Sequence, residues 1–588
     1  MKTRSRLMAG EARRRSRRRS DSAAGGPVWY VQPVGAAGAS THQVPDLLHG
    51  EPRRWGDLSG AAELVRFAFE GGDCAGAFDE IIEATPLAPS SFRKDSFADQ
   101  LFLEDLIKAC FQPAIEGKPY SFHRRLMIRI LTSPPEQAED VVVRHEVFRA
   151  LLRDEGLRGD VERLALALRA LRAALEAPPG EASQNVRRKI EALQALKDCI
   201  DALSDGFSDT DTVLSRLRPM GAKMKANDAY RRLSELLALE GHLATVDVRL
   251  SLGADGRIRG FGVLAVSEDS ANALLPTPLR RFLQRLSAFF RGYRYAEQEV
   301  VVRLLDSVFA PLVDSIVACI GLIGPLEFYL AGLSFDRVAR ARKLHAAIPE
   351  FVDPPLAPST DADRVDVERR LVGLYNPLLW LQNSDPRPAT LESSRHDALI
   401  ILTGPNSGGK TRLLQAVAIA QLLGQSGLLV PAREALLVRA PTMFVSLVVE
   451  SDAAQVEGRL GTELLRIRHL FEELQPGSLA ILDELCSGTN PMEGEAIFEM
   501  VVSLLPRVRP QVLISTHFLG LAARLAEERP YESLDFLAVE LDDQERPTFG
   551  FVPGVAETSL AHKVAARLGV TRGELEELVE QALERQKL

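Results

Sequence analysis

The sequence lacks the patterns that mark a disulfide framework, a zinc site or a membrane span. Its five cysteines are scattered, with no CxxC pair and no partnering histidines, which argues against zinc binding and fits a reducing, cytoplasmic location. The longest apolar stretch, residues 308–333, is interrupted by Asp314, Pro325 and Glu327. A bilayer span needs about 20 clean apolar residues, so we expect no membrane anchor.

A large excess of positive over negative charge is found in one short segment, and the rest of the chain is net negative. The chain carries a net charge of −9, yet residues 1–20 hold nine Lys and Arg against one Glu, and this net +8 leaves −17 for the rest. We predict a disordered basic arm at residues 1–42, because its Arg/Ser and Gly/Ala composition has no apolar period. Any nucleic-acid contact outside the arm therefore depends on local patches.

Two basic patches flank a predicted β tip, and solvated helix faces would give the same pattern. The first patch comprises Arg216, Arg218, Lys223, Lys225, Arg231 and Arg232. The second comprises Arg280, Arg281, Arg285, Arg291 and Arg294, interleaved with Tyr293 and Tyr295.

The 588 residues, 46% of them apolar, are enough for several hydrophobic cores. Helical spacing predicts a small, mainly helical domain at residues 43–134 and an extended helical lever that carries a small tip at residues 135–350. The lever begins with one long helix at Val141–Leu175. Alternating apolar residues around a Gly-rich turn predict a β-hairpin at about 245–267. A Pro-rich linker at 351–364 then leads into an α/β region at 365–588.

The α/β region contains three short apolar runs typical of buried parallel strands, at 398–403, 479–482 and 511–515. The first strand leads into a G-x-x-x-x-G-K-T sequence that opens a helix, the context of a phosphate-binding loop. Its residues are Gly404, Pro405, Asn406, Ser407, Gly408, Gly409, Lys410 and Thr411. In such a loop the backbone amides surround phosphate oxygens, Lys410 reaches the β- and γ-phosphates, and Thr411 binds Mg²⁺.

Acidic and imidazole groups follow the other two strands. Asp483 and Glu484 come directly after residues 479–482, where ligands bind in open α/β sheets. We predict that Asp483 holds Mg²⁺ and that Glu484 orients or deprotonates the attacking water. His517, after residues 511–515, is suited to sensing the γ-phosphate by a hydrogen bond.

These motifs, the run from Asp483 to Pro491 and the segment Val552–Ala561 together resemble the ABC-type ATPase of the MutS family of DNA mismatch-repair proteins. The resemblance implies ATP and Mg²⁺ as cofactors, DNA as a partner, a homodimer that closes as a clamp, and a possible MutL-like partner. It also implies an aromatic that stacks on adenine, for which Tyr375 is the candidate. Phe78-Asp79-Glu80 lacks the sequence pattern that surrounds the Phe-x-Glu wedge of mismatch readers, and we recognise no C-terminal nuclease domain, so we expect both features to be absent.

The sequence departs from the family pattern at one further position. In the family a serine from the opposite subunit completes each nucleotide site, and the matching position here is Gly458, unless Thr462 or Ser451 substitutes. The leading hypothesis is an ATP-driven clamp on DNA. Two alternatives stay open: a switch that binds ATP with little hydrolysis, and an ATPase that acts on ribosomes or structured RNA.

Overall fold

The structure is a computed structural model. It describes residues 44–56, 58–178, 182–241, 243–252, 258–269, 297–354, 369–447, 459–486, 490–557, 570 and 572–585. The predicted arm at 1–42, the turn of the predicted hairpin and most of the predicted linker lie outside the described residues. Residues from 42 onward form one compact unit.

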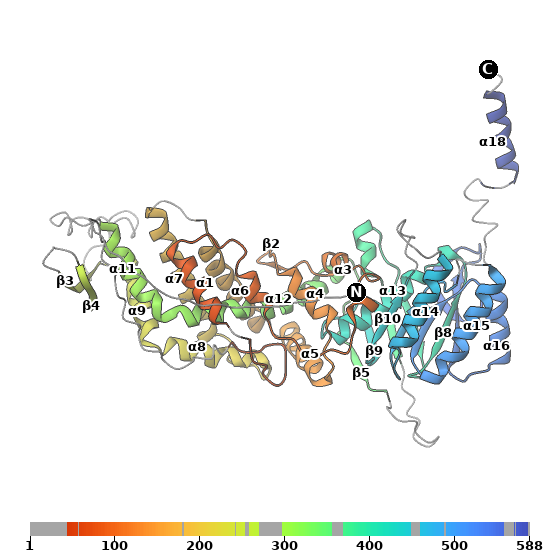
Figure 1. The fold of residues 1–588 in the computed structure, drawn as a ribbon, viewed down its shortest axis with the longest axis horizontal. Coiled ribbons are helices and arrows are strands. Elements are labelled where there is room, and N and C mark those ends of the chain that lie inside the picture. Colours follow the sequence, from red (N-terminus) through yellow and green to blue (C-terminus); the bar gives the residue numbers. More distant parts are fainter. Residues whose placement is uncertain are drawn as a thin grey trace, which may run out of the picture. The chain divides into compact units, whose positions relative to one another are not determined.

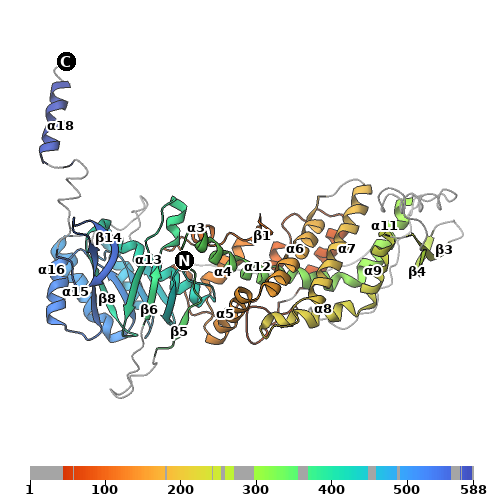
Figure 2. The same ribbon diagram turned by 180° about the vertical axis from the view of Figure 1, so that it is seen from behind.

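The first half of this unit is mainly helical (Figures 1 and 2). Its α-helices are α1 (Ser59–Glu70), α2 (Asp79–Glu83), α3 (Leu103–Cys110), α4 (Arg124–Thr132), α5 (Ala138–Arg153), α6 (Glu155–Glu176), α7 (Ala182–Asp205), α8 (Leu217–Lys225), α9 (Asp228–Gly241), α11 (Glu297–Phe309) and α12 (Val313–Ala341). The 3₁₀ turns are η1 (Lys94–Ser96), η2 (Val213–Arg216) and η3 (Ala310–Leu312), and the strands are β1 (Ala114–Ile115), β2 (Lys118–Pro119), β3 (Leu243–Leu252) and β4 (Ile258–Asp269). β3 and β4 pair antiparallel, as do β1 and β2.

The helix expected at Val141–Leu175 is two helices, α5 and α6. Asp154 separates them in an extended conformation, and its carboxylate accepts hydrogen bonds from the amides of Gly156 and Leu157 at 2.8 and 3.1 Å. A short acidic side chain at this position satisfies the free amides of a new helix N-terminus, so it favours a cap over helix continuation. The composition of the segment is helical throughout, which is why the break was not predicted.

α12 is the central helix of this region and contacts α1, α2, α3, α5 and α6. Its glycines permit close packing, because a Cβ at Gly324 would lie 2.4 Å from Leu126 Cδ2 and one at Gly332 would lie 2.3 Å from Phe148 Cζ. Inside the helix the carboxylate of Glu327 accepts a hydrogen bond from the amide of His123 at 2.7 Å. Burial raises the pKa of Glu327 to about 7.

The segment Val302–Ala341 is long and apolar enough to cross a membrane by length and composition. However, 72% of its most apolar window is buried inside the protein, and the core helix of a protein passes the same test.

The second half contains two sheets. The larger has the order β10 (Met443–Ser446), β11 (Leu479–Leu482), β12 (Gln511–Ser515), β8 (Leu399–Thr403), β13 (Leu534–Leu541) and β14 (Pro547–Pro553), in which the first five are parallel and β14 is antiparallel. The smaller has the order β5 (Glu350–Val352), β9 (Glu434–Val438), β6 (Arg369–Leu374) and β7 (Ala389–Ser393). The helical elements are η5 (Pro377–Gln382), η6 (Asn406–Gly408), α13 (Lys410–Gln425), α14 (Arg459–Glu473), α15 (Pro491–Val508), α16 (Leu519–Glu528) and α18 (Arg572–Arg585).

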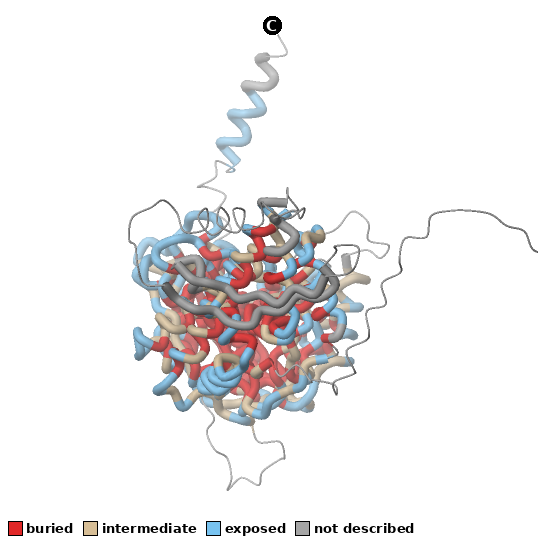
Figure 3. The backbone as a smooth tube through the Cα atoms, turned by 90° about the vertical axis from the view of Figure 1, so that its left-hand side faces the viewer, coloured by how far each residue is buried: buried red, intermediate tan, exposed pale blue. Residues whose placement is uncertain are grey.

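The three strands predicted in this half are confirmed as β8, β11 and β12, which lie in the middle of the larger sheet. The first residues of the predicted linker form a strand instead of an irregular connection. Phe351 and Val352 belong to β5 and pair with Leu437 and Val438 of β9. Buried residues occupy the interior (Figure 3), and the apolar ones among them form two clusters. The larger cluster extends from Val44 through α12 to β12, so the helical half and the smaller sheet share one core. The predicted domain boundaries stay predictions.

Candidate nucleotide-binding site

The predicted phosphate loop connects the central strand β8 to the N-terminus of α13. Gly404 and Gly409 have φ values of +128° and +88°, a region that favours glycine. A Cβ at Gly404 would also lie 2.8 Å from Val539 of β13. The two glycines therefore allow the loop to turn sharply against the neighbouring strand and to direct its backbone toward the end of the sheet.

Lys410 is the first residue of α13, and its ammonium group lies inside the loop. Its Nζ donates hydrogen bonds to the carbonyl of Gly404 at 2.7 Å and to Asn406 Oδ1 at 3.3 Å, and it lies 4.0 Å from Glu484 Oε1. The side chain is only 2% exposed. Burial lowers the pKa of Lys410, while the charges of Glu484 and Asp483 act in the opposite direction.

Asp483 and Glu484, which follow β11, lie next to the phosphate loop, which follows β8. They are close because β11 and β8 are the two neighbours of β12 in the sheet. Thr411 Oγ1 donates a hydrogen bond to Asp483 Oδ2 at 2.6 Å. The hydroxyl of Ser515, at the end of β12, donates to the other carboxylate oxygen of Asp483 and accepts from the amide of Glu484 at 2.9 Å. Glu484 has a positive φ of +46°, which is uncommon for a residue with a side chain. Ser515 thus fixes both acids, a role that the sequence did not reveal.

This donor set fits a magnesium-bound triphosphate. A threonine hydroxyl and a carboxylate in contact are hard oxygen ligands, and Mg²⁺ at phosphate sites is typically held by one or two protein ligands, water and the phosphates. Among the described residues no group of three or more His, Cys, Asp or Glu side chains could hold a metal by itself. Lys410 and the amides at the start of α13 supply the positive field that an anion needs.

Two other predicted site residues lie in the described part of the chain and make no side-chain hydrogen bond to the loop or to the two acids. His517 follows β12, is exposed, and packs its ring 4.2 Å from that of Phe518. Its ring has no hydrogen bond to Lys410, Asp483 or Glu484, all of which are described. Tyr375 is 2% exposed and contacts Trp380 at 5.5 Å between ring centroids. Tyr375 is therefore part of the core and has no free ring face for a base.

An aromatic residue that the sequence analysis missed lies beside the loop. Phe549 of β14 is 43% exposed, has φ of +66°, and its Cδ1 lies 3.3 Å from the position of a Cβ on Gly409. The guanidinium of Arg387 lies 5.9 Å from the centre of its ring. Phe549 is remote from the loop in sequence, and only the pairing of β14 with β13 brings it there.

The segment proposed to complete the site in a second subunit is largely outside the described residues. Gly458 and Ser451 lie outside them, and Thr462 is on α14. The prediction about this segment therefore stays a prediction.

The first basic patch is mostly engaged within the protein. Arg216 donates to backbone carbonyls, Lys225 pairs with Asp205 at 2.9 Å, and Arg231 and Arg232 both pair with Asp228. Two cations of this patch, Arg218 and Lys223, are exposed on α8. The second basic patch lies outside the described residues.

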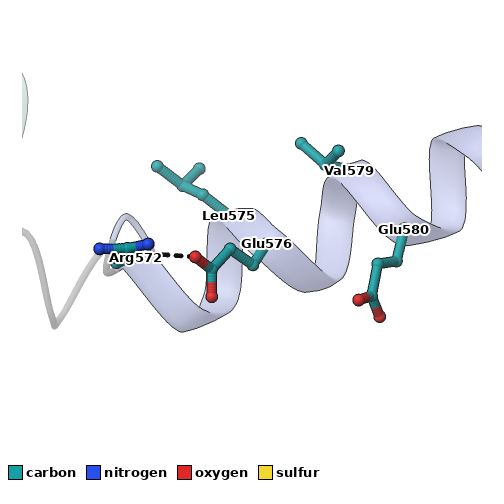
Figure 4. Close-up of a pocket in the computed structure, with 5 residues that line it drawn as sticks. All are labelled: Arg572, Leu575, Glu576, Val579 and Glu580. Carbon is teal, nitrogen blue, oxygen red and sulfur yellow. Dashed lines mark hydrogen bonds and ion pairs between the residues drawn. The ribbon is translucent and has the colours of Figure 1, made fainter.

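A shallow hollow lies along α18, apart from all the predicted site residues. It is lined by Arg572, Leu575, Glu576, Val579 and Glu580 of that one helix (Figure 4). Arg572 and Glu576 form an ion pair of 2.7 Å across its start.

Comparison with known proteins agrees with the site geometry. The family model of MutS domain V matches residues 400–586, which contain the loop, both acids and Phe549. The Endonuclease MutS2 of Streptococcus mutans serotype c is 28% identical over 401 residues, which cover 65% of this chain and 48% of that protein. Residues 400–586 are a MutS-family domain.

Other MutS-family relatives give the same result. The Endonuclease MutS2 of Thermus thermophilus is 27% identical over 312 residues, which cover 53% of this chain and 38% of that protein. That of Thermomicrobium roseum is 28% identical over 276 residues, or 47% of this chain and 34% of the relative. The chain thus spans half or less of the length of these relatives, and it carries a MutS domain V preceded by a helical region.

Proposed function

We propose that this chain is an ATPase of the MutS type that binds ATP with Mg²⁺ at the loop between β8 and α13 and hydrolyses it. The observation that supports the proposal best is that Lys410, Thr411, Asp483 and Glu484 come together at one end of the sheet, within hydrogen-bond or ion-pair distance of one another. Residues with these chemical properties are the recurring parts of phosphoryl-transfer sites.

Each side chain has a distinct task in this proposal. The Lys410 ammonium group and the loop amides bind the phosphates, and Lys410 neutralises the charge that develops on the transferred group. Thr411 and Asp483 hold Mg²⁺, which when bound polarises the phosphate oxygens. Glu484, held in its orientation through the Ser515 hydroxyl, positions the attacking water and accepts its proton. We propose His517 as the γ-phosphate sensor, and this role requires its exposed ring to turn toward the loop.

Phe549 is proposed as the platform on which the nucleobase stacks, in place of Tyr375. Its partly exposed ring adjoins Gly409, where the loop meets α13, and the Arg387 guanidinium lies over one part of the ring, 5.9 Å from its centre. A flat aromatic face next to a phosphate loop can bind the base while the loop binds the phosphates. Aromatic stacking tolerates different bases, so the platform would contribute affinity more than base selectivity.

Phe549→Ala should weaken ATP binding without removing catalysis. We expect the Kd for ATP to rise by about 5- to 150-fold, because stacking of a base on an aromatic ring contributes roughly 1–3 kcal/mol. Titration with a fluorescent ATP analogue measures this change. Tyr375→Phe is the matched control and should leave the Kd unchanged, since the Tyr375 hydroxyl is buried and makes no hydrogen bond with the described residues. An unaltered Kd for Phe549→Ala would exclude the platform.

We propose DNA as the macromolecular partner, contacted by the helical region of an ABC-type homodimer in the cytoplasm. The MutS-family domain supports this proposal, and the exposed Arg218 and Lys223 supply positive charge on α8. Contacts made through phosphates would be independent of sequence and steeply dependent on salt. A MutL-like partner and a preference for branched or mismatched DNA belong to the same proposal.

Competition at fixed salt tests the partner. Labelled branched DNA bound by the chain should be displaced by homoduplex, mismatched or branched DNA better than by structured RNA, and the affinity should change when ATP and Mg²⁺ are added. Arg218→Glu with Lys223→Glu should weaken all DNA binding alike. Preferential displacement by RNA would replace the DNA proposal with the ribosome or RNA alternative.

A further inference from the structure

A short segment near the start of the described chain has its carbonyl groups bound by side chains from other elements. Residues 44–50, here called the strap, form no helix or strand, and Leu47, Leu48 and His49 are fully buried. Five consecutive carbonyls of the strap each accept a hydrogen bond from a side chain. The donors are Arg216 to Asp46, His49 and Gly50, Tyr329 to Leu47, and Arg144 to Leu48.

Arg144 of α5 is the donor that also reaches the second half of the protein. Its Nε donates to the carbonyl of Leu48 at 3.0 Å, and its Nη1 donates to the carbonyl of Ser426 at 2.8 Å. The guanidinium lies 5.5 Å from the ring centre of Phe328 on α12, and the residue is 1% exposed. A planar guanidinium can hold two carbonyls in fixed directions, which a lysine ammonium cannot do.

Ser426 is the residue at which α13 ends, and α13 is the helix that begins with Lys410 in the phosphate loop. Every residue of α13 after Arg412 is buried, so this helix of about 24 Å is packed along its length. We expect such a closely packed helix to move as a unit. Its last turn fits tightly against Arg144, because a Cβ at Gly427 would lie 2.5 Å from Arg144 Cδ. The positive guanidinium also complements the negative end of the α13 dipole.

We infer that Arg144 is a positioning residue that couples the nucleotide site to the helical half of the protein, an inference that rests on the proposed ATPase function. A displacement of the loop end of α13 moves its far end, and Arg144 connects that end to the strap and to α12. The strap in turn is bound to η2 through Arg216 and to α12 through Tyr329. Arg144 thereby forms a direct contact between the helix that binds phosphate and the helices of the proposed lever.

The wild-type chain provides the first test. Hydrogen exchange followed by mass spectrometry reports on the strap, since the amides of Leu48 and Gly50 are hydrogen-bonded to Asp46 and Asp140. A non-hydrolysable ATP analogue with Mg²⁺ should change the exchange rate of these amides. A strap whose exchange is the same with and without bound analogue would overturn the coupling role, and this measurement needs no variant to fold.

Two lysine variants separate loss of coupling between α13 and the strap from a general loosening of the strap. Arg144→Lys keeps the charge and loses the two-carbonyl bridge, and we expect the analogue-dependent change at the strap to fall by at least about fivefold, the lower end of ordinary coupling between sites. The Kd for the analogue should stay the same. Arg216→Lys also weakens the hydrogen bonds to the strap, but Arg216 makes no hydrogen bond to α13, a helix described over its whole length. In this variant the strap amides should exchange faster both with and without the analogue, and the change caused by the analogue should remain.

The outcomes distinguish failure of the coupling role from failure of the proposed ATPase function. Loss of the response in Arg144→Lys alone supports the coupling role. A full response in Arg144→Lys, or an equal loss in Arg216→Lys, overturns it while the nucleotide site stands. Failure of the wild-type chain to bind the analogue overturns the proposed function and the coupling role with it.

Discussion

Lys410→Ala should reduce the rate of ATP hydrolysis by at least about 10²-fold, the usual effect of removing one preorganised charge donor from a site that excludes water. Lys410 is 2% exposed and lies within hydrogen-bond distance of Gly404 and Asn406, so its ammonium group is fixed where the phosphates of ATP would bind. Steady-state phosphate release at saturating ATP measures the effect. ATP affinity should fall as well, because the same group attracts the bound phosphates.

The fold should tolerate this change. Burial disfavours the charged form of Lys410, as its lowered pKa indicates, so its removal deletes a group whose burial costs free energy. The unfolding temperature should therefore change little. Arg412→Ala is the matched control: Arg412 lies on the same turn of α13, is exposed, and donates to Gln415 away from the loop. Equal turnover by Lys410→Ala and the wild type would remove the ATPase proposal altogether.

The parts of this site that were predictable are encoded in short contiguous segments. The strand before Gly404 and the one before Asp483 are short continuous apolar runs typical of a buried strand, and each is followed by polar residues or a turn. Parallel pairing then brings the ends of β8, β11 and β12 together. The meeting of Thr411 with Asp483 follows from the order of strands and needs no knowledge of the rest of the fold.

The parts that were not predictable depend on contacts between distant segments. Tyr375 and Phe549 are both aromatic residues near loop or strand ends, and only packing decides that the first is buried against Trp380 and the second stays exposed beside Gly409. Arg144 is likewise one of several arginines in an amphipathic helix. Its contact with Ser426 joins residues 282 positions apart, a separation at which periodicity carries no information.

Glu484→Gln should separate ATP binding from ATP hydrolysis. The amide keeps the shape of the side chain but cannot accept the proton of the attacking water, so we expect turnover to fall by about 10²- to 10⁴-fold, the typical contribution of a general base. ATP binding should be retained or become tighter, because the change removes a negative charge 4.0 Å from Lys410 Nζ and close to the phosphates. Single-turnover kinetics and nucleotide titration measure the two effects separately.

Asp483→Asn is the informative comparison, since it changes the neighbouring carboxylate by the same chemistry. Asp483 contacts Thr411 and Ser515, so this variant should lose magnesium-dependent ATP affinity, whereas Glu484→Gln should not. If Asp483 is a metal ligand and Glu484 is the general base, both variants should hydrolyse ATP slowly. Only Asp483→Asn should then bind ATP more weakly. If the wild type hydrolyses ATP within a single turnover and Glu484→Gln does so at the same rate, Glu484 is not the base. If the wild type itself binds ATP but shows no measurable single turnover, the chain is a switch that binds ATP with little hydrolysis.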